Sequence, residues 1–147
     1  MIYEPKEDSY LLKKEVKRFS KGKKVLDLGS GSGIQALAAL KSGAKDVLAA
    51  DINKEAIIIL KNKGLNALES DLFSKIKGKF DLIVFNPPYL PQDKREDSES
   101  KIITTGGKKG DEIILRFLKQ VKKHLEKQGI ILMVLSSLTP KKRILTL

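Results

Sequence analysis

Short, continuously apolar runs alternate along this chain with amphipathic ones, and this alternation restricts the fold more than any other feature. The apolar runs predict strands at residues 24–29, 47–50, 67–69, 80–85 and 130–135. Apolar residues at helical spacing predict helices at residues 34–41, 54–62 and 111–127. Strands that are apolar throughout and separated by helices indicate a parallel sheet covered on both faces. We therefore predict an α/β fold with a central, mostly parallel sheet flanked by helices.

Length, charge and cysteine content limit the class of protein. The 147 residues predict a single domain spanning residues 1–147. The formal net charge of +11 suits either a solvated, lysine-rich surface or a protein that works beside RNA. The chain has no Cys, which excludes disulfides and a thiol nucleophile, and we expect no metal site. No run of 18 apolar residues and no signal-peptide pattern occurs, so we expect a cytoplasmic protein without a membrane span.

A glycine-rich turn follows the first predicted strand and opens the first predicted helix. Gly29, Gly31 and Gly33 are spaced G-x-G-x-G, and Ile34 stands where a dinucleotide-binding fingerprint needs its third glycine. This spacing argues against a pyrophosphate cofactor. Glycines let the backbone approach a ligand and offer it N–H groups. Asp51 ends the second predicted strand, where a carboxylate can accept both hydroxyls of a ribose. Together these residues favour a nucleoside-containing ligand over a plain tight turn.

The sequence Asn86-Pro87-Pro88-Tyr89 follows the fourth predicted strand directly. The prolines remove two backbone donors and leave stiff carbonyl acceptors, and Asn86 adds a side-chain carbonyl. Two converging acceptors suit a planar –NH2 group, whose delocalised lone pair makes it a poor nucleophile. Hydrogen bonds to both of its hydrogens favour the pyramidal form that can attack, and Tyr89 can stack on the flat group. We predict catalysis by positioning, with a plain turn as the alternative.

In combination, these residues resemble those of class I S-adenosylmethionine-dependent methyltransferases that carry the Asn-Pro-Pro-Tyr motif. The opening Tyr-Glu-Pro-Lys-Glu-Asp-Ser at residues 3–9 resembles the Tyr-Glu-Pro-x-Glu-Asp-Thr opening of the HemK2/Mtq2 group. That group comprises the archaeal and eukaryotic release-factor glutamine N5-methyltransferases. Residues 51–53 and 71–72 resemble its cofactor motifs, and residues 105–110 resemble its Ala-Gly-Gly-x-x-Gly loop.

The resemblance implies a Rossmann-like fold, S-adenosylmethionine as cofactor, and a role for each matching position. Asp27 and Gly29 would contact the methionine part of the cofactor, Asp51 the ribose, and Asp71 with Leu72 the adenine. The implied cofactor site comprises Ser9, Asp27, Gly29, Gly31, Gly33, Asp51, Ile52, Asp71, Leu72 and Asn86. The implied catalytic residues are Asn86, Pro87 and Tyr89, and Pro88 joins them in the substrate site.

The resemblance also implies a substrate and a partner. In the family, the substrate is the glutamine of the Gly-Gly-Gln loop of a class I peptide release factor. Family members work with a small zinc-binding activator of the Trm112 type. Two alternatives remain open. The first is a nucleic-acid methyltransferase acting on adenine or guanine amino groups, which the positive charge suits but no appended RNA-binding domain supports. The second is a truncated, inactive module that binds S-adenosylmethionine and holds a partner.

The C-terminal region departs from the family pattern. A full class I methyltransferase continues beyond its fifth strand with a helix and an antiparallel strand pair. Here residues 139–143 resemble the start of that helix, with Thr139 as its cap and Pro140 at its first position, and the sequence ends at Leu147. We therefore expect the strand pair to be lacking and the fifth strand to form an apolar edge that invites pairing with another chain. We expect His124, the only histidine, to be a solvated surface residue.

Overall fold

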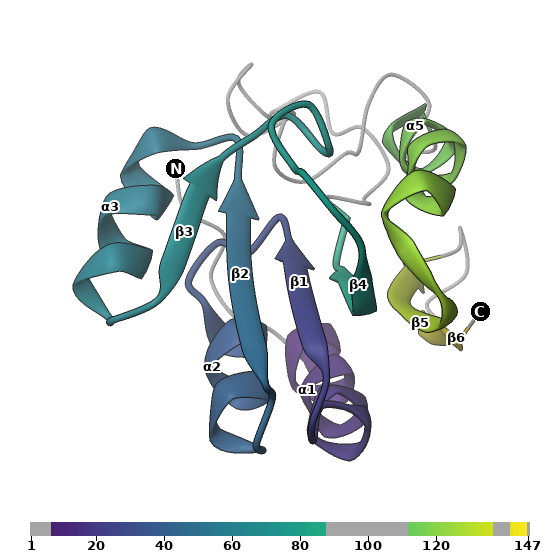
Figure 1. Ribbon diagram of the computed structural model, residues 1–147, viewed down its shortest axis with the longest axis horizontal. Coiled ribbons are helices and arrows are strands. Elements are labelled where there is room, and N and C mark those ends of the chain that lie inside the picture. The colour runs from purple at the N-terminus through teal and green to yellow at the C-terminus, as the bar shows by residue number, and fades with distance from the viewer. Residues whose placement is uncertain (1–6, 88–111, 137–141, 147) are drawn as a thin grey trace.

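The computed structural model describes residues 7–87, 112–136 and 142–146 (Figure 1). The helices are α1 (Glu7–Phe19), α2 (Ile34–Lys41), α3 (Lys54–Asn62), α5 (Glu112–Val121) and the short 3-10 helix η1 (Lys122–His124). The strands are β1 (Lys24–Leu28), β2 (Asp46–Asp51), β3 (Asn66–Glu69), β4 (Phe80–Phe85), β5 (Leu125–Ser136) and β6 (Lys142–Thr146). Within these ranges, no helix is long and apolar enough to cross a membrane.

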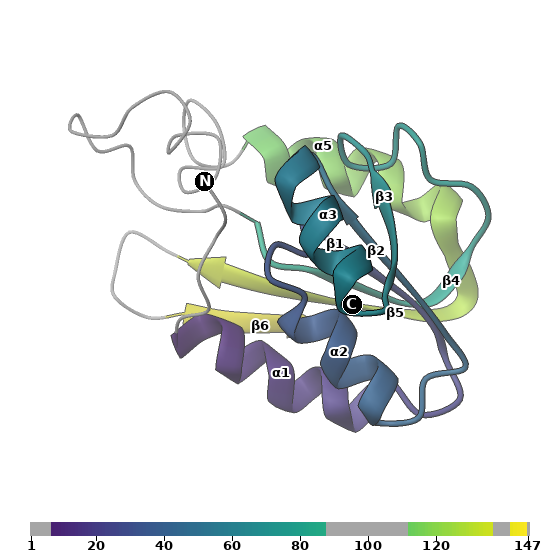
Figure 2. The same cartoon turned by 90° about the vertical axis from the view of Figure 1, so that its left-hand side faces the viewer.

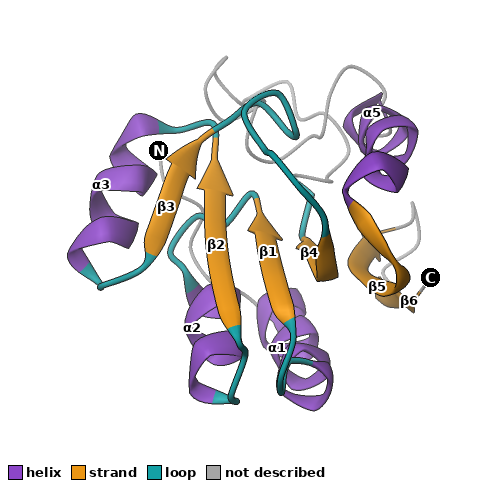
Figure 3. Cartoon of the chain, viewed as in Figure 1, coloured by secondary structure: helices purple, strands orange, loops and turns teal. Residues whose placement is uncertain are grey.

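The strands form one sheet in the order β3-β2-β1-β4-β5-β6 (Figures 1 and 3). The strands β1 to β5 run parallel, and β6 runs antiparallel to β5. The chain builds outward from β1 to β3 and then crosses back to place β4 on the other side of β1. In open α/β sheets, ligands bind in the crevice outside the carboxyl ends of the strands at such a reversal, which here lies between β1 and β4. The predicted α/β class with a mostly parallel sheet is confirmed.

Helices cover both faces of the sheet because alternate strand residues point to opposite sides. Val25 packs with α1, α2 and α3 on one face, whereas Leu26 packs with α5 and the segment after β3 on the other. Figure 2 shows α1 and α2 on the side of the sheet opposite to α5. Both faces of β1 and β4 are therefore buried, which explains why these strands are apolar almost throughout.

The boundary between the last helix and the fifth strand differs from the prediction. The structure ends α5 at Val121 and begins β5 at Leu125, whereas the sequence pattern predicted one helix over 111–127. Leu125 continues the helical spacing of apolar residues, but it pairs with Phe80 and packs in the core on the α5 face. The pairing then shifts before Ile130, and Gly129 permits this irregularity, since a Cβ there would lie 2.5 Å from Leu125 Cδ1. The intervening polar residues stay exposed.

The C-terminal expectation is also corrected. The fifth strand is not an unpaired edge, because β6 pairs with it from Leu132↔Thr146 to Ser136↔Lys142. Residues 142 and 143, which were expected in a helix, belong to β6, while Thr139 and Pro140 lie outside the described residues. We expected no antiparallel strand after β5, but the structure has one, β6. It covers the carboxyl half of β5 and removes its exposed edge there.

Gly33 is required where the glycine-rich turn enters α2. Its φ is +87°, and a Cβ on it would lie 2.8 Å from Leu60 Cδ2 and 3.2 Å from Leu65 Cδ1. We expect Gly33→Ala to lower the free energy of unfolding by roughly 2–4 kcal/mol, combining left-handed backbone strain with overpacking. Urea denaturation measures this change.

Gly22→Ala is the matched control, because its φ is +72° but nothing lies within 4 Å of the added Cβ. It should show only the backbone cost, about 1–2 kcal/mol. Equal losses in the two variants would contradict the assigned contact of Gly33 with α3.

Candidate active site

The two sequence motifs meet at the carboxyl edge of the sheet. β1 and β4 are neighbours with Leu28 opposite Phe85, so the residues that follow, Gly29 and Asn86, leave the sheet side by side. A Cβ built on Gly29 would lie 3.9 Å from Phe85 Cε1 and 4.0 Å from the backbone oxygen of Asn86. A side chain at Gly29 would therefore fill the space between the glycine-rich turn and Asn86. The glycine-rich turn and the Asn86-Pro87 corner therefore lie side by side at the carboxyl edge of the sheet.

Asp51 fixes the glycine-rich turn from the neighbouring strand. Its Oδ2 accepts a hydrogen bond from the Gly31 N–H (2.8 Å), and its Oδ1 accepts one from the Asn53 N–H (2.9 Å). The backbone of the turn is also held by the Gly29 N–H, which donates to the Ala50 carbonyl (2.9 Å). A carboxylate has about four acceptor positions. Asp51 therefore shapes the turn and retains acceptor capacity for two ligand hydroxyls.

Asp27 is a buried carboxyl group beneath the turn. Its side chain lies on the face of β1 that α2 covers and is 2% exposed. Its Oδ2 accepts hydrogen bonds from Ser30 Oγ (2.7 Å) and from the Ala36 N–H of α2 (3.0 Å). The pKa of Asp27 is raised from 3.8 to about 7. Burial is the main cause, the hydrogen bonds from Ser30 and Ala36 oppose it, and the charge of Asp51 adds a smaller increase.

The raised pKa of Asp27 predicts a pH-dependent stability. The unfolded chain loses this proton near pH 3.8 and the folded chain near pH 7, so stability falls as the pH rises through that window. Between pH 5 and pH 8, the wild type should lose about 2–3 kcal/mol relative to Asp27→Asn, which cannot ionise. Urea unfolding of both proteins at the two pH values measures the difference. A gap that stays constant with pH would contradict the raised pKa.

A short chain of polar contacts connects Asn86 to two helices. Asn86 Nδ2 donates to Ser9 Oγ of α1 (3.4 Å), and Gln35 Nε2 of α2 donates to the Ser9 carbonyl (2.8 Å). Because Nδ2 is directed toward Ser9, the carbonyl oxygen Oδ1, which is the acceptor of the Asn86 side chain, can face a substrate. The Gln35 side chain is buried, and its Oε1 has no hydrogen-bond partner within the described part of the chain. Sequence analysis missed Gln35; its one signal was a polar residue on the buried side of a helix.

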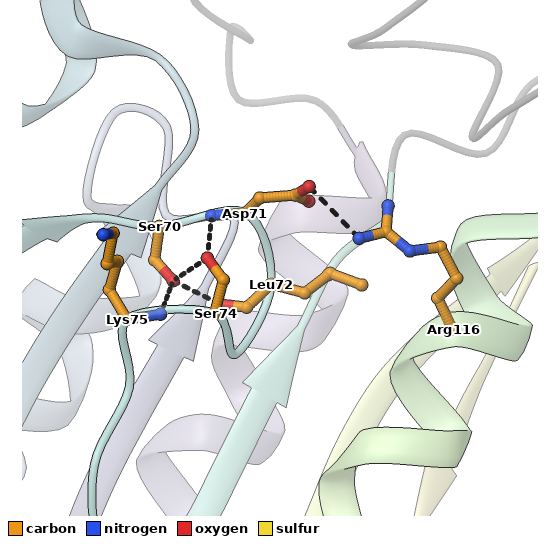
Figure 4. A network of polar contacts seen from close by, with 6 residues as sticks. All are labelled: Ser70, Asp71, Leu72, Ser74, Lys75 and Arg116. Atoms are coloured by element: carbon orange, nitrogen blue, oxygen red, sulfur yellow. Dashed lines mark hydrogen bonds and ion pairs between the residues drawn. The ribbon is translucent and has the colours of Figure 1, made fainter.

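A second polar network follows β3 (Figure 4). The Asp71 N–H donates to Ser74 Oγ (3.1 Å), and Ser70 Oγ donates to the Leu72 carbonyl (2.7 Å). Arg116 of α5 forms an ion pair with Asp71 (3.1 Å), with both side chains about half exposed. Leu72 has a positive φ of 51° and a buried side chain. The network holds the turn after β3 against α5, and Arg116 is a site residue that sequence analysis did not identify.

The remaining predicted residues lie in different positions. Ile52 is 53% exposed and directly follows Asp51, and the Ser70 N–H donates to the Asp51 carbonyl (2.9 Å), so the turn after β3 adjoins Asp51. Pro87 is buried at the end of β4. Pro88 and Tyr89 lie outside the described residues, as does the loop at 105–110. The expectation that residues from β1, β2, β3 and β4 gather at one edge is met by those that the structure describes.

His124 lies away from this crevice, and its predicted environment is wrong in part. Its ring stacks on Phe73 with 4.7 Å between centroids, and Nδ1 lies 2.9 Å from the Gly78 carbonyl oxygen. Gly78 precedes β4, so His124 is at the edge where the parallel strands begin. It is therefore half-buried and packed, and it takes no part in the site.

The residues at the carboxyl edge fit S-adenosylmethionine. The crevice offers a carboxylate with spare acceptor positions at Asp51, a buried titratable carboxyl at Asp27, and an exposed apolar surface at Ile52. The absence of a side chain at Gly29 leaves room for a ligand to come close to the backbone of the turn, because a Cβ there would lie beside Phe85 and Asn86. A doubly wound parallel sheet in the order β3-β2-β1-β4-β5, with these residues at its topological switch point, is the architecture of class I S-adenosylmethionine-dependent methyltransferases.

Comparison with known proteins gives the family. The family model of the methyltransferase small domain matches residues 7–147, and the chain belongs to this family. A Methanocaldococcus jannaschii protein provisionally named as a protein N5-glutamine methyltransferase is 42% identical over 149 aligned positions, covering 96% of this chain and 75% of the relative. The release factor glutamine methyltransferase of Borreliella burgdorferi is 35% identical over 124 positions, covering 75% of this chain and 43% of that protein.

A solved structure supports the cofactor. The S-adenosylmethionine-dependent methyltransferase of Bacteroides fragilis in complex with S-adenosylhomocysteine has a TM-score of 0.60 and 28% identity, covering 86% of this chain. This chain spans 47% of that structure and less than half of the Borreliella burgdorferi enzyme. S-adenosylmethionine is the cofactor of the family, and the described residues provide the crevice that would hold it.

Proposed function

We propose that this chain methylates the side-chain nitrogen of the glutamine in the Gly-Gly-Gln loop of a class I peptide release factor. The observation that carries the proposal is the position of Asn86, which leaves β4 beside the glycine-rich turn with Oδ1 available as an acceptor. The similarity to the two glutamine methyltransferases supports this substrate. The cofactor supplies a methyl group bound to a positively charged sulfur.

The chain's own residues would act by positioning the amide. Asn86 Oδ1 and a backbone carbonyl of the proline corner would accept the two hydrogens of the –NH2 group, which weakens delocalisation of the nitrogen lone pair. With S-adenosylmethionine bound, the positioned nitrogen would accept the methyl group that the cofactor supplies, the sulfur would keep the electron pair of the C–S bond, and the proton released from the nitrogen would pass to water. Pro87 and Pro88 stiffen the corner, and Tyr89 would stack on the flat amide.

We further propose the cofactor contacts. Asp27, Gly29, Gly31 and Gly33 would surround the methionine part of the cofactor. Asp51 and Ile52 would contact the ribose, and Asp71 with Leu72 the adenine. Ser9, which the family resemblance assigns to the cofactor, also contacts Asn86 and would hold its amide in the productive orientation.

The charge around the site favours a protein over a nucleic acid as methyl acceptor. The described segments at the carboxyl edge, 27–33, 51–55, 69–75 and 86–87, contain five carboxylates and two lysines. Arg116, which pairs with Asp71, and Lys63, whose Nζ donates to the Ser32 carbonyl, also lie against these segments, so the five carboxylates face four cations. The described part of the edge therefore offers no positive surplus to hold a phosphate backbone, whereas it is compatible with a peptide loop.

We also propose further partners and a location for the enzyme. A Trm112-type zinc-binding activator would assist the enzyme, and the substrate would bring it near the ribosome and its RNA. Translation termination takes place in the cytoplasm, where we place the protein. We also propose that residues 1–147 act as one domain.

Radiolabelled methyl transfer tests this function. The chain is incubated with labelled S-adenosylmethionine and, in parallel, a class I release factor, the same factor with its loop glutamine changed to alanine, and total RNA. Label in the native factor alone supports the proposal. Label in RNA alone or in both forms of the factor would contradict it. The assay is repeated with a Trm112-type activator, and no transfer to any acceptor with or without it would favour a binding module instead.

A further inference from the structure

The edge of the sheet opposite to the site carries a surplus of positive charge. The segments that precede or begin β1, β2, β4 and β5 are 20–24, 42–46, 77–81 and 122–127. Together they contain nine lysines: Lys21, Lys23, Lys24, Lys45, Lys77, Lys79, Lys122, Lys123 and Lys127. The same segments contain three carboxylates, those of Asp46, Asp81 and Glu126. Their surplus of six positive charges is more than half of the net +11 of the chain. We call these nine residues the lysine edge.

Hydrogen bonds tie the lysine edge into one surface. The Gly22 N–H donates to the Gly43 carbonyl (2.9 Å), and the Lys45 N–H donates to the Lys23 carbonyl (2.8 Å). Lys24 donates its N–H to Asp81 Oδ2 (2.9 Å). These contacts join the segments before β1, β2 and β4. The fourth segment, 122–127, is joined to the segment before β4 by the contact of His124 Nδ1 with the Gly78 carbonyl oxygen. The lysines therefore stand on a fixed frame rather than on independent loops.

The lysine side chains are available to a partner. Lys24 is half-buried with Nζ 4.9 Å from the centre of the Phe80 ring, and the other eight are exposed. None of the eight forms an ion pair with another residue in the described ranges. The three carboxylates of the same segments offset only part of their charge, so an anionic partner would neutralise the rest.

The dimensions and composition of the lysine edge fit the backbone of a nucleic-acid duplex. The four segments lie at four neighbouring strands about 4.8 Å apart, which gives an edge roughly 14 Å long. A DNA duplex carries one phosphate charge per ~1.7 Å, which places about eight charges along that length. Ammonium groups bind phosphates as point charges and read no sequence. No aromatic side chain is exposed in these four segments to stack on single-stranded bases.

A membrane surface fits less well. Proteins that adsorb to anionic lipids usually combine basic residues with exposed apolar ones that enter the headgroup region. The large apolar side chains that are exposed in the described residues lie outside the four segments; they are Tyr10, Leu11, Leu40, Ile52, Ile58, Ile59, Leu115 and Leu118. The lysine edge offers charge alone.

We propose that the lysine edge docks on the phosphate backbone of double-helical RNA. The RNA acts as a docking partner and not as a methyl acceptor, because it binds at the edge that faces away from the site. The crevice at the carboxyl edge therefore remains open to a protein substrate while RNA is bound.

Fluorescence anisotropy with a labelled RNA duplex of about 20 base pairs tests the proposal on the full chain, at salt concentrations between about 50 and 200 mM. Lys23→Glu combined with Lys79→Glu should weaken binding at least tenfold. It should also reduce the slope of log affinity against log salt by about two, since two phosphate contacts are lost. Lys14→Glu combined with Lys54→Glu is the matched control, because both side chains are exposed outside the four segments. The control pair should change affinity less than threefold.

Equal weakening by the two pairs would overturn the proposal, because it would show a response to net charge alone. Stronger binding to phosphatidylserine vesicles than to the duplex would also overturn it, as would absence of duplex binding at low salt. Circular dichroism melting confirms that each variant is folded. Methyl transfer by Lys23→Glu/Lys79→Glu on isolated release factor should equal that of the wild type. RNA docking and glutamine methylation can therefore fail independently of each other.

Discussion

Replacing Asn86 with alanine should lower kcat for methyl transfer on the order of 10²- to 10³-fold, the effect expected when one positioned hydrogen-bonding group is lost. The reason is the geometry at the end of β4. Asn86 Nδ2 is occupied by Ser9 Oγ, so Oδ1 is the acceptor left for the substrate amide. Alanine removes this acceptor but leaves Asp27, Asp51 and the glycine-rich turn unchanged. The dissociation constant of S-adenosylmethionine should therefore change less than about threefold, measured by isothermal titration calorimetry.

Asn62→Ala is the control for this substitution, because Asn62 ends α3 and its side chain is exposed. Its turnover should match that of the wild type. If Asn86→Ala lost cofactor affinity in the same proportion as turnover, Asn86 would be a cofactor ligand and its assigned role would be wrong.

Asp51→Ala should produce the second large effect, a loss of cofactor affinity of about 1.5–3 kcal/mol, or roughly 10- to 150-fold. Two charge-assisted hydrogen bonds to the ribose hydroxyls are lost. The Gly31 and Asn53 N–H groups also lose their acceptors, so part of the loss comes from a loosened turn. Calorimetry measures the affinity, and urea unfolding of the same variant measures how much of the change is structural.

The same strand supplies a matched control. β2 begins at Asp46 and ends at Asp51, so the two carboxylates lie at opposite edges of the sheet. Asp46→Ala makes the same chemical change on the same element and should leave cofactor affinity within about twofold of the wild type. Similar losses in both variants would show that general electrostatics, and not a contact at Asp51, controls binding.

The sequence was sufficient to place the candidate residues at one edge of the sheet because parallel strands share an edge. Each apolar run predicted a strand, and the polar residues that followed it, such as Asp51 and Asn86, had to gather at the carboxyl side. The contacts made by Ser9, Gln35 and Arg116 could not be predicted in this way. They depend on how α1, α2 and α5 pack on the sheet, and the spacing of residues along one element does not determine that packing.

Local pattern also failed at the end of the chain. Leu125 lies four residues after Val121, so its spacing continues the helix, but pairing with Phe80 gives it a strand conformation. Residues 142 and 143 follow Pro140 and resemble the first turn of a helix by local rules. In the structure, these residues pair with the edge of β5 that would otherwise be free, and this strand pairing satisfies their backbone groups. Tertiary context outweighs local propensity at both positions.

The hydrogen bond between the Gly31 N–H and Asp51 Oδ2 has a consequence for the kinetics of ligand uptake. Because the Asp51 carboxylate already shapes the turn, the backbone of the turn loses its conformational entropy when the chain folds and not when the ligand binds. Association should then follow simple one-step kinetics, with an observed rate that rises linearly with ligand concentration and shows no plateau. A crevice that formed only on encounter would instead saturate at a rate limited by rearrangement.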